Sequence, residues 1–409
     1  MKTLLMHKDV PVLEVAKDGT CRILEPKLLP VGIRKPEVTL ADYYGVWLSN
    51  RAIQLGRTNA KLILNSLRLP QTNSIAVCEA CHALNLTDCY WIRNEEEALN
   101  WHDINLYCNT ISKSLAVTAL LGESLTEHEK IRTPELTTQG ISAKAWIRKE
   151  NDLYLYKIGR REVPASQILD ALGIEHVNYY VVEGEELKEV ASDDKQEQIE
   201  LWNEKVVKSG LITSEERSLV TFEDYKYYCE SQGRDPFDEI LKLDRTHYLQ
   251  MQVADYILNN MDRHTGNWGL FMDNRTGALM RLHPLMDHDH AFAKMNKIYS
   301  QTTGRHMTLQ EAAVIAQSEL HLDVSGLFDM EKPELLTQEE WDQVQARGAA
   351  LQRLVPIYEE FLREGSDVNI EMLEKMDRWT KLLHRKIKVS EFQELSAAET
   401  AESIGTGLC

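Results

Sequence analysis

The 409-residue sequence lacks any run of about 18 apolar residues, the length that a membrane-spanning helix needs. Residues 1–9 also lack the apolar run of a signal peptide, so we expect a cytoplasmic protein. Basic residues are few, because 46 Lys and Arg stand against 64 Asp and Glu and give a formal net charge of -18. A field of this sign does not suit non-specific binding to nucleic acid or to an anionic membrane, and neither partner is expected.

The seven cysteines are odd in number and scattered, which favours reduced thiols. Cys78, Cys81 and His82 match the C-x-x-C-H spacing of covalent haem attachment, and with Cys89 they could also bind zinc. Residues 74–84 nevertheless have the pattern of an amphipathic helix with both of the first two cysteines on one face. We favour buried thiols over a metal site or haem, because a free cysteine commonly serves as a small core hydrophobe.

The length predicts two or three domains or one two-lobed enzyme, and 43% apolar with 27% charged residues indicates a globular chain. The predicted parts are a small β subdomain at 1–35, a helical segment at 36–130, a mixed α/β unit at 131–190, a mainly helical unit at 200–395 and a disordered tail at 396–409. The acidic residues 184–198, poor in apolar side chains, are interpreted as a solvated connection between the two larger units.

Periodicity and turn signals predict the elements that position the candidate site. The predicted strands are residues 4–7, 10–15, 21–24, 145–148, 153–157, 177–182, 268–272 and 278–282. The predicted helices include residues 163–172, 308–320, 337–364 and 369–386. The strands at 268–272 and 278–282 are joined by a short turn and should form an antiparallel hairpin.

The segment NNMDRHTGNWGLFM, residues 259–272, places chemically specific side chains between two apolar segments. Because an antiparallel hairpin brings its two ends together, Asn267 should lie near Asp287, and Asp262 is on the same loop. Carboxylate and amide oxygens suit Mg²⁺, and the D-x-x-x-x-N spacing with a later Asp is that of a kinase catalytic loop. The alternative is a polar turn whose Asp and Asn cap backbone groups.

A kinase also needs groups that bind the phosphates of ATP. Lys157 ends a predicted strand, and Glu162 begins the next helix, where a carboxylate could pair with the lysine. The preceding loop offers Gly140, Ser142 and Lys144, whose backbone amides and ammonium group could cover the phosphates. The order of loop, lysine, glutamate, catalytic Asp, Asn and metal Asp predicts a two-lobed kinase-like α+β fold that binds ATP and Mg²⁺.

These residues, with DRHTGN at 262–267 and HPLMD at 283–287, resemble the HipA family of bacterial serine/threonine kinases. The Asp-Arg-His triplet is also similar to the catalytic loop of phosphatidylinositol kinases. The resemblance implies a HipA-like fold with a mixed α/β N-lobe and a mainly helical C-lobe, a protein substrate and a separately encoded antitoxin. It implies that Asp262 is the catalytic base, that Asn267 and Asp287 hold Mg²⁺, and that Glu162 orients the phosphate-binding Lys157.

The resemblance also suggests autoregulation, because several HipA-like kinases phosphorylate a serine of the phosphate loop and thereby eject the loop. The matching region here contains threonines instead, so Thr137, Thr138 and Ser142 are the candidate acceptors. Two departures stand out: Arg263 replaces a residue that is often smaller in the family, and the segment at 40–125 has no counterpart that can be matched.

Other classes of protein share some of these features. A metal-dependent phosphohydrolase could use the crowded acidic and histidine side chains His264, His283, Asp287, His288, Asp289 and His290. A catalytically silent binding protein on the kinase fold is a second alternative. A lipid kinase is a third, which the acidic charge and the missing membrane elements disfavour.

Overall fold

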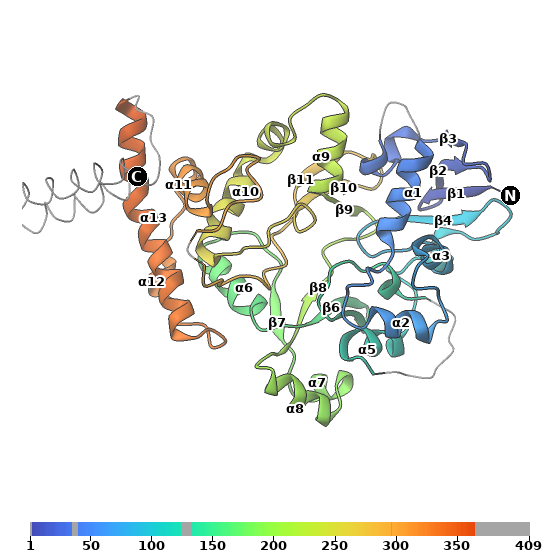
Figure 1. Ribbon diagram of the computed structural model, residues 1–409, viewed down its shortest axis with the longest axis horizontal. Helices are drawn as coiled ribbons and strands as arrows, with labels where there is room; N and C mark the ends of the chain where they lie inside the picture. Colours follow the sequence, from blue (N-terminus) through green and yellow to red (C-terminus); the bar gives the residue numbers. More distant parts are fainter. Residues whose placement is uncertain (1, 35–39, 124–131, 296, 365–409) are drawn as a thin grey trace, which may run out of the picture.

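The computed structural model describes residues 2–34, 40–123, 132–295 and 297–364. Within these ranges the chain is a mixed α/β protein with three antiparallel sheets and helices that cover them (Figure 1). The helix predicted at 369–386 and the tail predicted at 396–409 lie outside the described residues.

The first sheet has the strand order β3-β2-β1-β4. Its strands are β1 (Thr3–His7), β2 (Val10–Val15), β3 (Cys21–Ile23) and β4 (Tyr90–Asn94). The three strands predicted near the N-terminus are confirmed, and Gly19 supplies the left-handed φ of 84° that the turn after β2 requires. The prediction that 36–130 is helical is wrong at β4, which pairs with β1 along its whole length.

Helices and short 3-10 turns make up the rest of this part of the chain. They are η1 (Pro26–Leu28), η2 (Val31–Ile33), α1 (Leu40–Arg51), α2 (Ala60–Ser66), α3 (Ser74–Ala80), α4 (Trp101–Ile104), α5 (Lys113–Leu121) and η3 (Pro134–Leu136). Cys78 and Cys81 are buried and their thiols contact backbone carbonyls, and burial raises their pKa values to about 11 and about 12. These contacts are those of buried thiols, as the sequence favoured.

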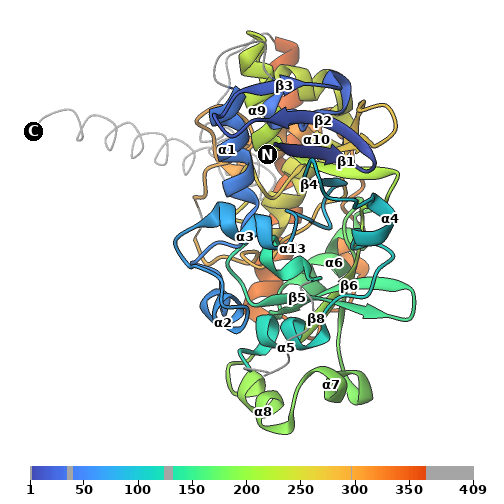
Figure 2. The same cartoon turned by 90° about the vertical axis from the view of Figure 1, so that its right-hand side faces the viewer.

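The second sheet has the order β5-β6-β8-β7 and carries the predicted lysine. Its elements are β5 (Lys144–Lys149), β6 (Asp152–Ile158), α6 (Glu162–Ala171), β7 (Tyr179–Val181), α7 (Gly184–Val190), α8 (Asp193–Leu201) and β8 (Val206–Gly210). Two expectations need correction. Residues 184–198 form α7 and α8, which extend from the lower end of the molecule in both views (Figures 1 and 2). The sheet also includes β8, which lies beyond the range 131–190.

The third sheet has the order β11-β10-β9 and lies beside the long helices of the C-terminal half. The elements are β9 (Arg217–Thr221), α9 (Phe222–Ser231), α10 (Pro236–Leu258), β10 (Gly269–Asp273), β11 (Leu279–Leu282), α11 (Leu309–Leu320), α12 (Gly326–Asp329) and α13 (Gln338–Glu364). The predicted β10–β11 hairpin is confirmed. Gly269 allows β10 to approach β9, since a Cβ there would collide with the carbonyl oxygen of Val220.

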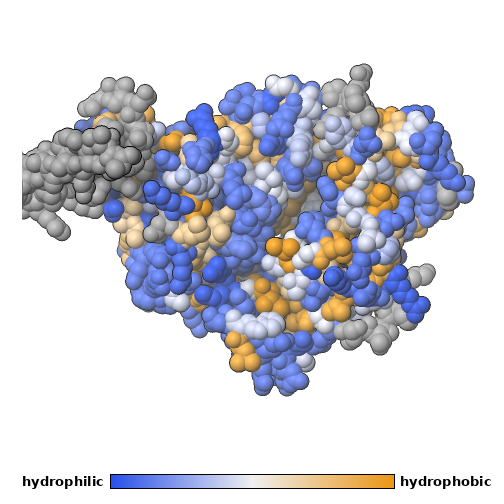
Figure 3. Space-filling view, in the orientation of Figure 1, coloured by the Kyte–Doolittle hydropathy of each residue, from blue (hydrophilic) through white to orange (hydrophobic). Residues whose placement is uncertain are grey.

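Helix α10 forms the centre of this half and ends at the candidate catalytic loop. Its last three turns are almost entirely buried, because α11 and α13 pack against it (Figure 1). In the part of the chain that the structure describes, no helix has the length and apolar character to cross a membrane. Figure 3 shows a largely hydrophilic face, with hydrophobic side chains gathered near β6, β7 and β8.

Candidate active site

Lys157 lies near the end of β6 and contacts two carboxylates at once. Its ammonium donates to Glu162 Oε1 at 2.6 Å and also to Asp287 Oδ1. Only 5% of the Lys157 side chain is exposed. Burial alone would lower its pKa, but the charges of Asp287 and Glu162 outweigh burial and raise it well above the ordinary value. Lys157 is therefore a permanent cation held in a fixed position.

Asp287 and Glu162 share this one ammonium, but their pKa values are shifted in opposite directions. Burial would raise the pKa of Asp287, yet the ammonium groups of Lys157 and Lys144 outweigh it and hold that pKa well below the usual range. Glu162 is more deeply buried, and burial raises its pKa although Lys157 opposes the shift. The Glu162 carboxylate is anchored on its other side by the backbone N–H of His288, at 2.8 Å from Oε2.

A second lysine points at the same place from the neighbouring strand. Lys144 is directly opposite Lys157 in the β5–β6 register, and opposite residues of an antiparallel pair share a face of the sheet. Lys144 is buried, and its ammonium occupies the space where a Cβ on Gly140 would lie. Burial and the charge of Lys157 lower the pKa of Lys144 to about 8. The two cations therefore form a site suited to a polyanion.

The loop between η3 and β5 contacts Lys144 and the segment that follows Asp287. Gly140 has a left-handed φ of 91°, and the Ser142 hydroxyl donates to Asp289 Oδ2 at 3.0 Å. Asp289 lies two residues after Asp287, the candidate metal ligand. The Ser142 bond therefore joins the loop before β5 to the segment after β11. Thr137 is fully buried and bonded to the carbonyl of Leu84, which removes it from the surface. Thr138 and Ser142 are both partly exposed, and the Thr138 hydroxyl donates to the carbonyl of Pro134 at 2.8 Å.

The candidate catalytic loop begins where α10 ends. Asp262 is partly exposed, with 39% of its side chain accessible, as a residue that meets a substrate requires. Asn267 is buried, and its Nδ2 donates to the backbone carbonyl of Asp262 at 2.9 Å, which closes the loop on itself. Because the amide nitrogen makes this bond, the amide oxygen is the polar atom of the Asn267 side chain that remains for another contact.

Arg263 joins this loop to the segment that carries Asp287. Its Nη1 donates both to the Asn267 carbonyl at 3.2 Å and to the Met286 carbonyl at 2.6 Å. The predicted approach of the two ends of the β10–β11 hairpin is therefore mediated by a guanidinium. Arg263 is itself held by an ion pair with Asp255 of α10 at 3.0 Å, with both side chains nearly inaccessible.

In the sequence, Arg263 stands out only as a departure from the family pattern, and no role is predicted for Asp255. A signal is nevertheless present, since Asp255 lies in a largely apolar part of α10 and a buried carboxylate needs a cationic partner. The other missed support lies in the unmatched segment at 40–125. Arg57, in the turn before α2, forms a fully buried ion pair with Glu135 at 2.7 Å and donates to the carbonyls of Thr138 and Lys144.

Glu135 completes this support by accepting from the backbone N–H of Trp146 at 2.8 Å. Nearby backbone bonds join Ile53 to Leu136 and Thr58 to Ile141. The helical segment is thus a scaffold for the phosphate-loop candidate, a relationship between residues about 80 positions apart that no local pattern reveals.

The histidines do not converge on one point. His283 Nδ1 contacts the Pro284 carbonyl, and burial lowers the His283 pKa to about 4. His288 Nδ1 lies 3.2 Å from Arg263 Nη2, so this nitrogen accepts and the ring proton sits on Nε2. His290 lies 3.9 Å from Asp262 and from Asp289. Among the described residues, no group of three or more His, Cys, Asp or Glu side chains could hold a metal by themselves.

The donor set does fit a Mg²⁺ that is bound together with a nucleotide. Among the described residues, neither Asn267 Oδ1 nor Asp287 Oδ2 accepts a side-chain hydrogen bond, so each is free to face a cation. Mg²⁺ takes hard oxygen ligands and is usually bound by one or two protein carboxylates together with substrate phosphates and water. A transition-metal hydrolase site would need convergent histidines, and the contacts above direct them elsewhere.

The sequence matches no protein-family model and no curated protein. A solved structure of the Shewanella oneidensis MR-1 toxin–antitoxin system HipA, HipB and operator DNA is 11% identical. That match covers 90% of this chain and 100% of that chain, with a TM-score of 0.53. The Helicobacter pylori proinflammatory kinase CtkA is 14% identical over 51% of this chain and 90% of that chain, with a TM-score of 0.36.

The likeness to the HipA structure confirms the predicted fold class, a mixed α/β protein with a HipA-like kinase fold. At 11% identity the likeness concerns the fold alone. The roles of the individual residues therefore rest on the contacts described above, since one fold can serve many functions.

Proposed function

We propose that this protein is a serine/threonine protein kinase that depends on ATP and Mg²⁺. The observation that carries the proposal is the position of Lys157, whose ammonium bridges Glu162 on α6 and Asp287 on the opposite half. A kinase needs this lysine, glutamate and metal-ligating aspartate in place together. A structural lysine at a strand end has no need of two carboxylates, and burying the charges of Lys157 and Glu162 is costly.

The phosphates of ATP would be bound by Lys157 and Lys144, with the loop at Gly140 covering them. Mg²⁺, when bound, would neutralise charge on the transferring phosphoryl group. Asn267 and Asp287 would hold it through the amide oxygen and the free carboxylate oxygen. Arg263 would keep these two ligands at a fixed separation, because one guanidinium nitrogen bonds to the backbone on both sides.

The transfer step would be an in-line displacement. The hydroxyl oxygen of a Ser or Thr side chain attacks the γ-phosphorus, and the bond from that phosphorus to the β,γ-bridging oxygen breaks with its electron pair leaving on ADP. The hydroxyl proton passes to the carboxylate of Asp262, whose partial exposure suits contact with a protein substrate. Lys157 and Lys144 stabilise the charge that develops on the phosphate oxygens.

A separately encoded antitoxin is part of the same proposal. The similar HipA structure was solved with HipB and operator DNA, and a partner of that kind would supply the DNA contact that a chain with a net charge of -18 does not favour. Autophosphorylation of the phosphate loop is proposed at Ser142 rather than at Thr138, because a phosphate on Ser142 would repel Asp289, whereas the Thr138 hydroxyl bonds to the Pro134 carbonyl of its own segment.

The test is thermal stabilisation of the purified chain by ATP with and without Mg²⁺, followed by transfer of labelled γ-phosphate to a mixed protein substrate. We expect Mg²⁺-dependent stabilisation and label on Ser or Thr, because a ligand that binds only the folded state raises its stability. Absence of stabilisation at millimolar ATP contradicts the nucleotide site. Release of inorganic phosphate without labelled protein would indicate a hydrolase instead.

A further inference from the structure

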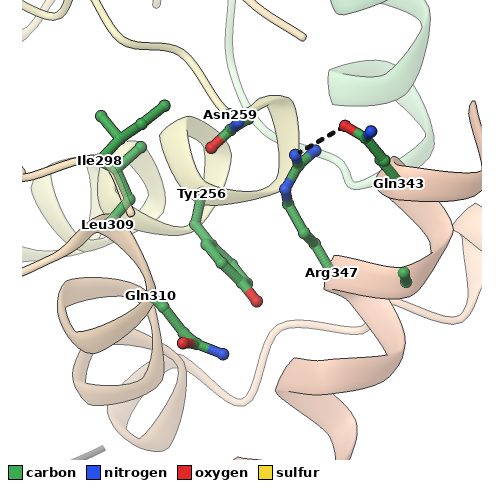
Figure 4. A pocket seen from close by; sticks show the side chains of 8 residues that line it. Tyr256, Asn259, Ile298, Leu309, Gln310, Gln343 and Arg347 are labelled. Atoms are coloured by element: carbon green, nitrogen blue, oxygen red, sulfur yellow. Dashed lines mark hydrogen bonds between the residues drawn. The ribbon is translucent and has the colours of Figure 1, made fainter. Parts of the chain in front are cut away.

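A cavity separate from the candidate active site lies between α10, α11 and α13. Its volume is about 270 Å³. Sites that bind drug-sized ligands usually have volumes of about 300–1,000 Å³, so this cavity is slightly smaller. The lining residues are Tyr256, Asn259, Ile298, Leu309, Gln310, Gln343, Ala346 and Arg347. Figure 4 shows the Tyr256 side chain in the middle of the cavity, between Arg347 on one side and Ile298 with Leu309 on the other.

Arg347 is the charged group of this cavity, and its charge is not neutralised by the described residues. Its Nη2 donates to the amide oxygen of Gln343 at 3.3 Å, whereas Nη1 is buried and makes no hydrogen bond within the described ranges. Burial lowers the pKa of Arg347, and the one group that opposes this shift is the phenol of Tyr256, which is uncharged at neutral pH, rather than a carboxylate. A guanidinium is always charged at neutral pH, so a buried unpaired N–H is costly.

The remaining polar groups are the right kind for a ligand with an oxyanion. The side chains of Gln310 and Gln343 enter from α11 and α13, and amides can donate to or accept from a small polar molecule. Ile298 and Leu309 provide an apolar wall. Arginine binds carboxylate and phosphate oxygens with two parallel N–H groups, and such charge-assisted bonds are among the strongest in proteins.

We propose that this cavity binds a small metabolite-sized oxyanion, a carboxylate or phosphate, through the guanidinium of Arg347. The site adjoins the candidate catalytic loop, because Asn259 lines the cavity and also donates to the carbonyls of Ala293 and Met295, in the segment that follows Asp287. A bound anion would therefore rest against the residue that anchors that segment. The proposal does not depend on the kinase function.

The test compares thermal stability of the parent and Arg347→Gln across a titration of inorganic phosphate and, separately, of citrate. Both anions also stabilise proteins by exclusion from the surface, but that effect is shared by the two proteins. We expect a saturable rise of a few degrees in the parent, with at least one probe, that Arg347→Gln lacks. Phosphate alone would indicate a phosphate or phosphate ester as the natural ligand, and citrate alone a carboxylate.

Two further variants make the result decisive. Ala346→Trp, at an exposed position that lines the cavity, should fill it and abolish the saturable rise without removing a charge. The same comparison in a Lys157→Met background, where the proposed ATP site is disabled, should leave the rise intact. Equal responses of the parent, Arg347→Gln and Ala346→Trp overturn the proposal, and a response that disappears only with Lys157→Met assigns the anion to the ATP site.

Discussion

Lys157 and Asp287 are 130 residues apart in the sequence, yet the ammonium of the first donates directly to a carboxylate oxygen of the second. The contact joins β6 to the loop after β11. Lys157 is therefore paired with carboxylates of the site itself, whereas no ion pair of Lys144 is found among the described residues. A nucleotide would compete with Asp287 for the lysine, and Mg²⁺ would compete with the lysine for Asp287.

The first prediction concerns Asp287, which has a left-handed φ of 61°. Asparagine tolerates this conformation better than alanine does, so Asp287→Asn removes the charge with little strain. We expect phosphate transfer to fall at least about 100-fold, because a metal ligand contributes several kcal/mol to the transition state. The measurements are labelled transfer and ATP-induced stabilisation with and without Mg²⁺. Mg²⁺-dependent stabilisation equal to that of the parent would remove Asp287 from the metal site.

The second prediction concerns pH. Since the pKa of Lys144 is lowered to about 8, this side chain loses its proton as the pH rises through that value, whereas Lys157 remains charged. A triphosphate favours the ammonium form, so the Kd for ATP should rise by up to about tenfold per pH unit above the folded pKa. Calorimetric titration from pH 7 to 9.5 measures it. Lys144→Met should bind more weakly and lose this dependence; an unchanged profile would exclude Lys144.

The lowered pKa of Lys144 has the opposite effect on the stability of the protein without ligand: ATP binding weakens as the pH rises, whereas the free energy of unfolding increases. The unfolded chain keeps the Lys144 proton up to the ordinary lysine pKa, so between about pH 8 and 10 it binds more protons than the folded chain. The contribution of Lys144 to the free energy of unfolding therefore increases with pH in this window. The difference between parent and Lys144→Met in urea unfolding isolates this contribution.

The third prediction concerns Gly140. An alanine there would be strained at a φ of 91° and would displace the Lys144 ammonium. Gly173→Ala is the matched control, because Gly173 also has a positive φ of 63° but nothing lies near its would-be Cβ. Both variants should lose about 1–2 kcal/mol of stability. Only Gly140→Ala should weaken ATP binding, and equal ATP affinities would separate Gly140 from the phosphate site.

The local parts of this molecule follow from sequence patterns, and the long-range parts do not. The β10–β11 hairpin and α6 are short-range elements, so periodicity and turn residues locate them within about two residues. The order of Asp262, Asn267 and Asp287 along one loop and hairpin could be interpreted for the same reason. Their chemical roles stay predictions until they are measured.

Pairings between distant segments were missed because the chain gives no local sign of them. β4 is a short run inside a helical region and becomes a strand only because β1 offers an edge. Residues 184–198 are acidic and poor in apolar side chains, and their helices α7 and α8 are mostly exposed, so the pattern resembled a solvated connection. Arg263 is a different case: the buried carboxylate of Asp255 signals a cationic partner, but the sequence does not show that this partner is Arg263, eight residues later on the loop.

The fourth prediction concerns the scaffold of the phosphate loop. Arg57→Met leaves Glu135 buried without its cation, which should cost about 3–5 kcal/mol in the free energy of unfolding. Adding Glu135→Gln removes the unpaired charge and keeps an acceptor for the Trp146 N–H, so the double variant should recover the part of the loss that comes from this charge. The part that comes from the carbonyls of Thr138 and Lys144, which lose their donor in both variants, should remain. Urea unfolding of the parent and of both variants measures these differences.

The exposed pair Arg245–Glu319 supplies the control for the scaffold. Arg245→Met should change the free energy of unfolding by at most about 1 kcal/mol, since exposed ion pairs contribute little. If Arg57→Met costs no more than Arg245→Met, the buried pair does not hold the loop.

The last prediction separates catalysis from nucleotide binding. Asp262 is partly exposed, and its link to Asn267 uses the backbone carbonyl rather than the carboxylate. Asp262→Asn should therefore keep the fold, the position of Asn267 and the Mg²⁺-dependent stabilisation by ATP. Transfer to protein should fall by about 100- to 10,000-fold, the usual contribution of a general base.

His264→Gln, at an exposed neighbouring position on the same loop, should keep transfer near the parent rate. Parent-like transfer by Asp262→Asn would show that the hydroxyl proton goes elsewhere, and a simultaneous loss of ATP stabilisation would place Asp262 among the residues that bind the nucleotide.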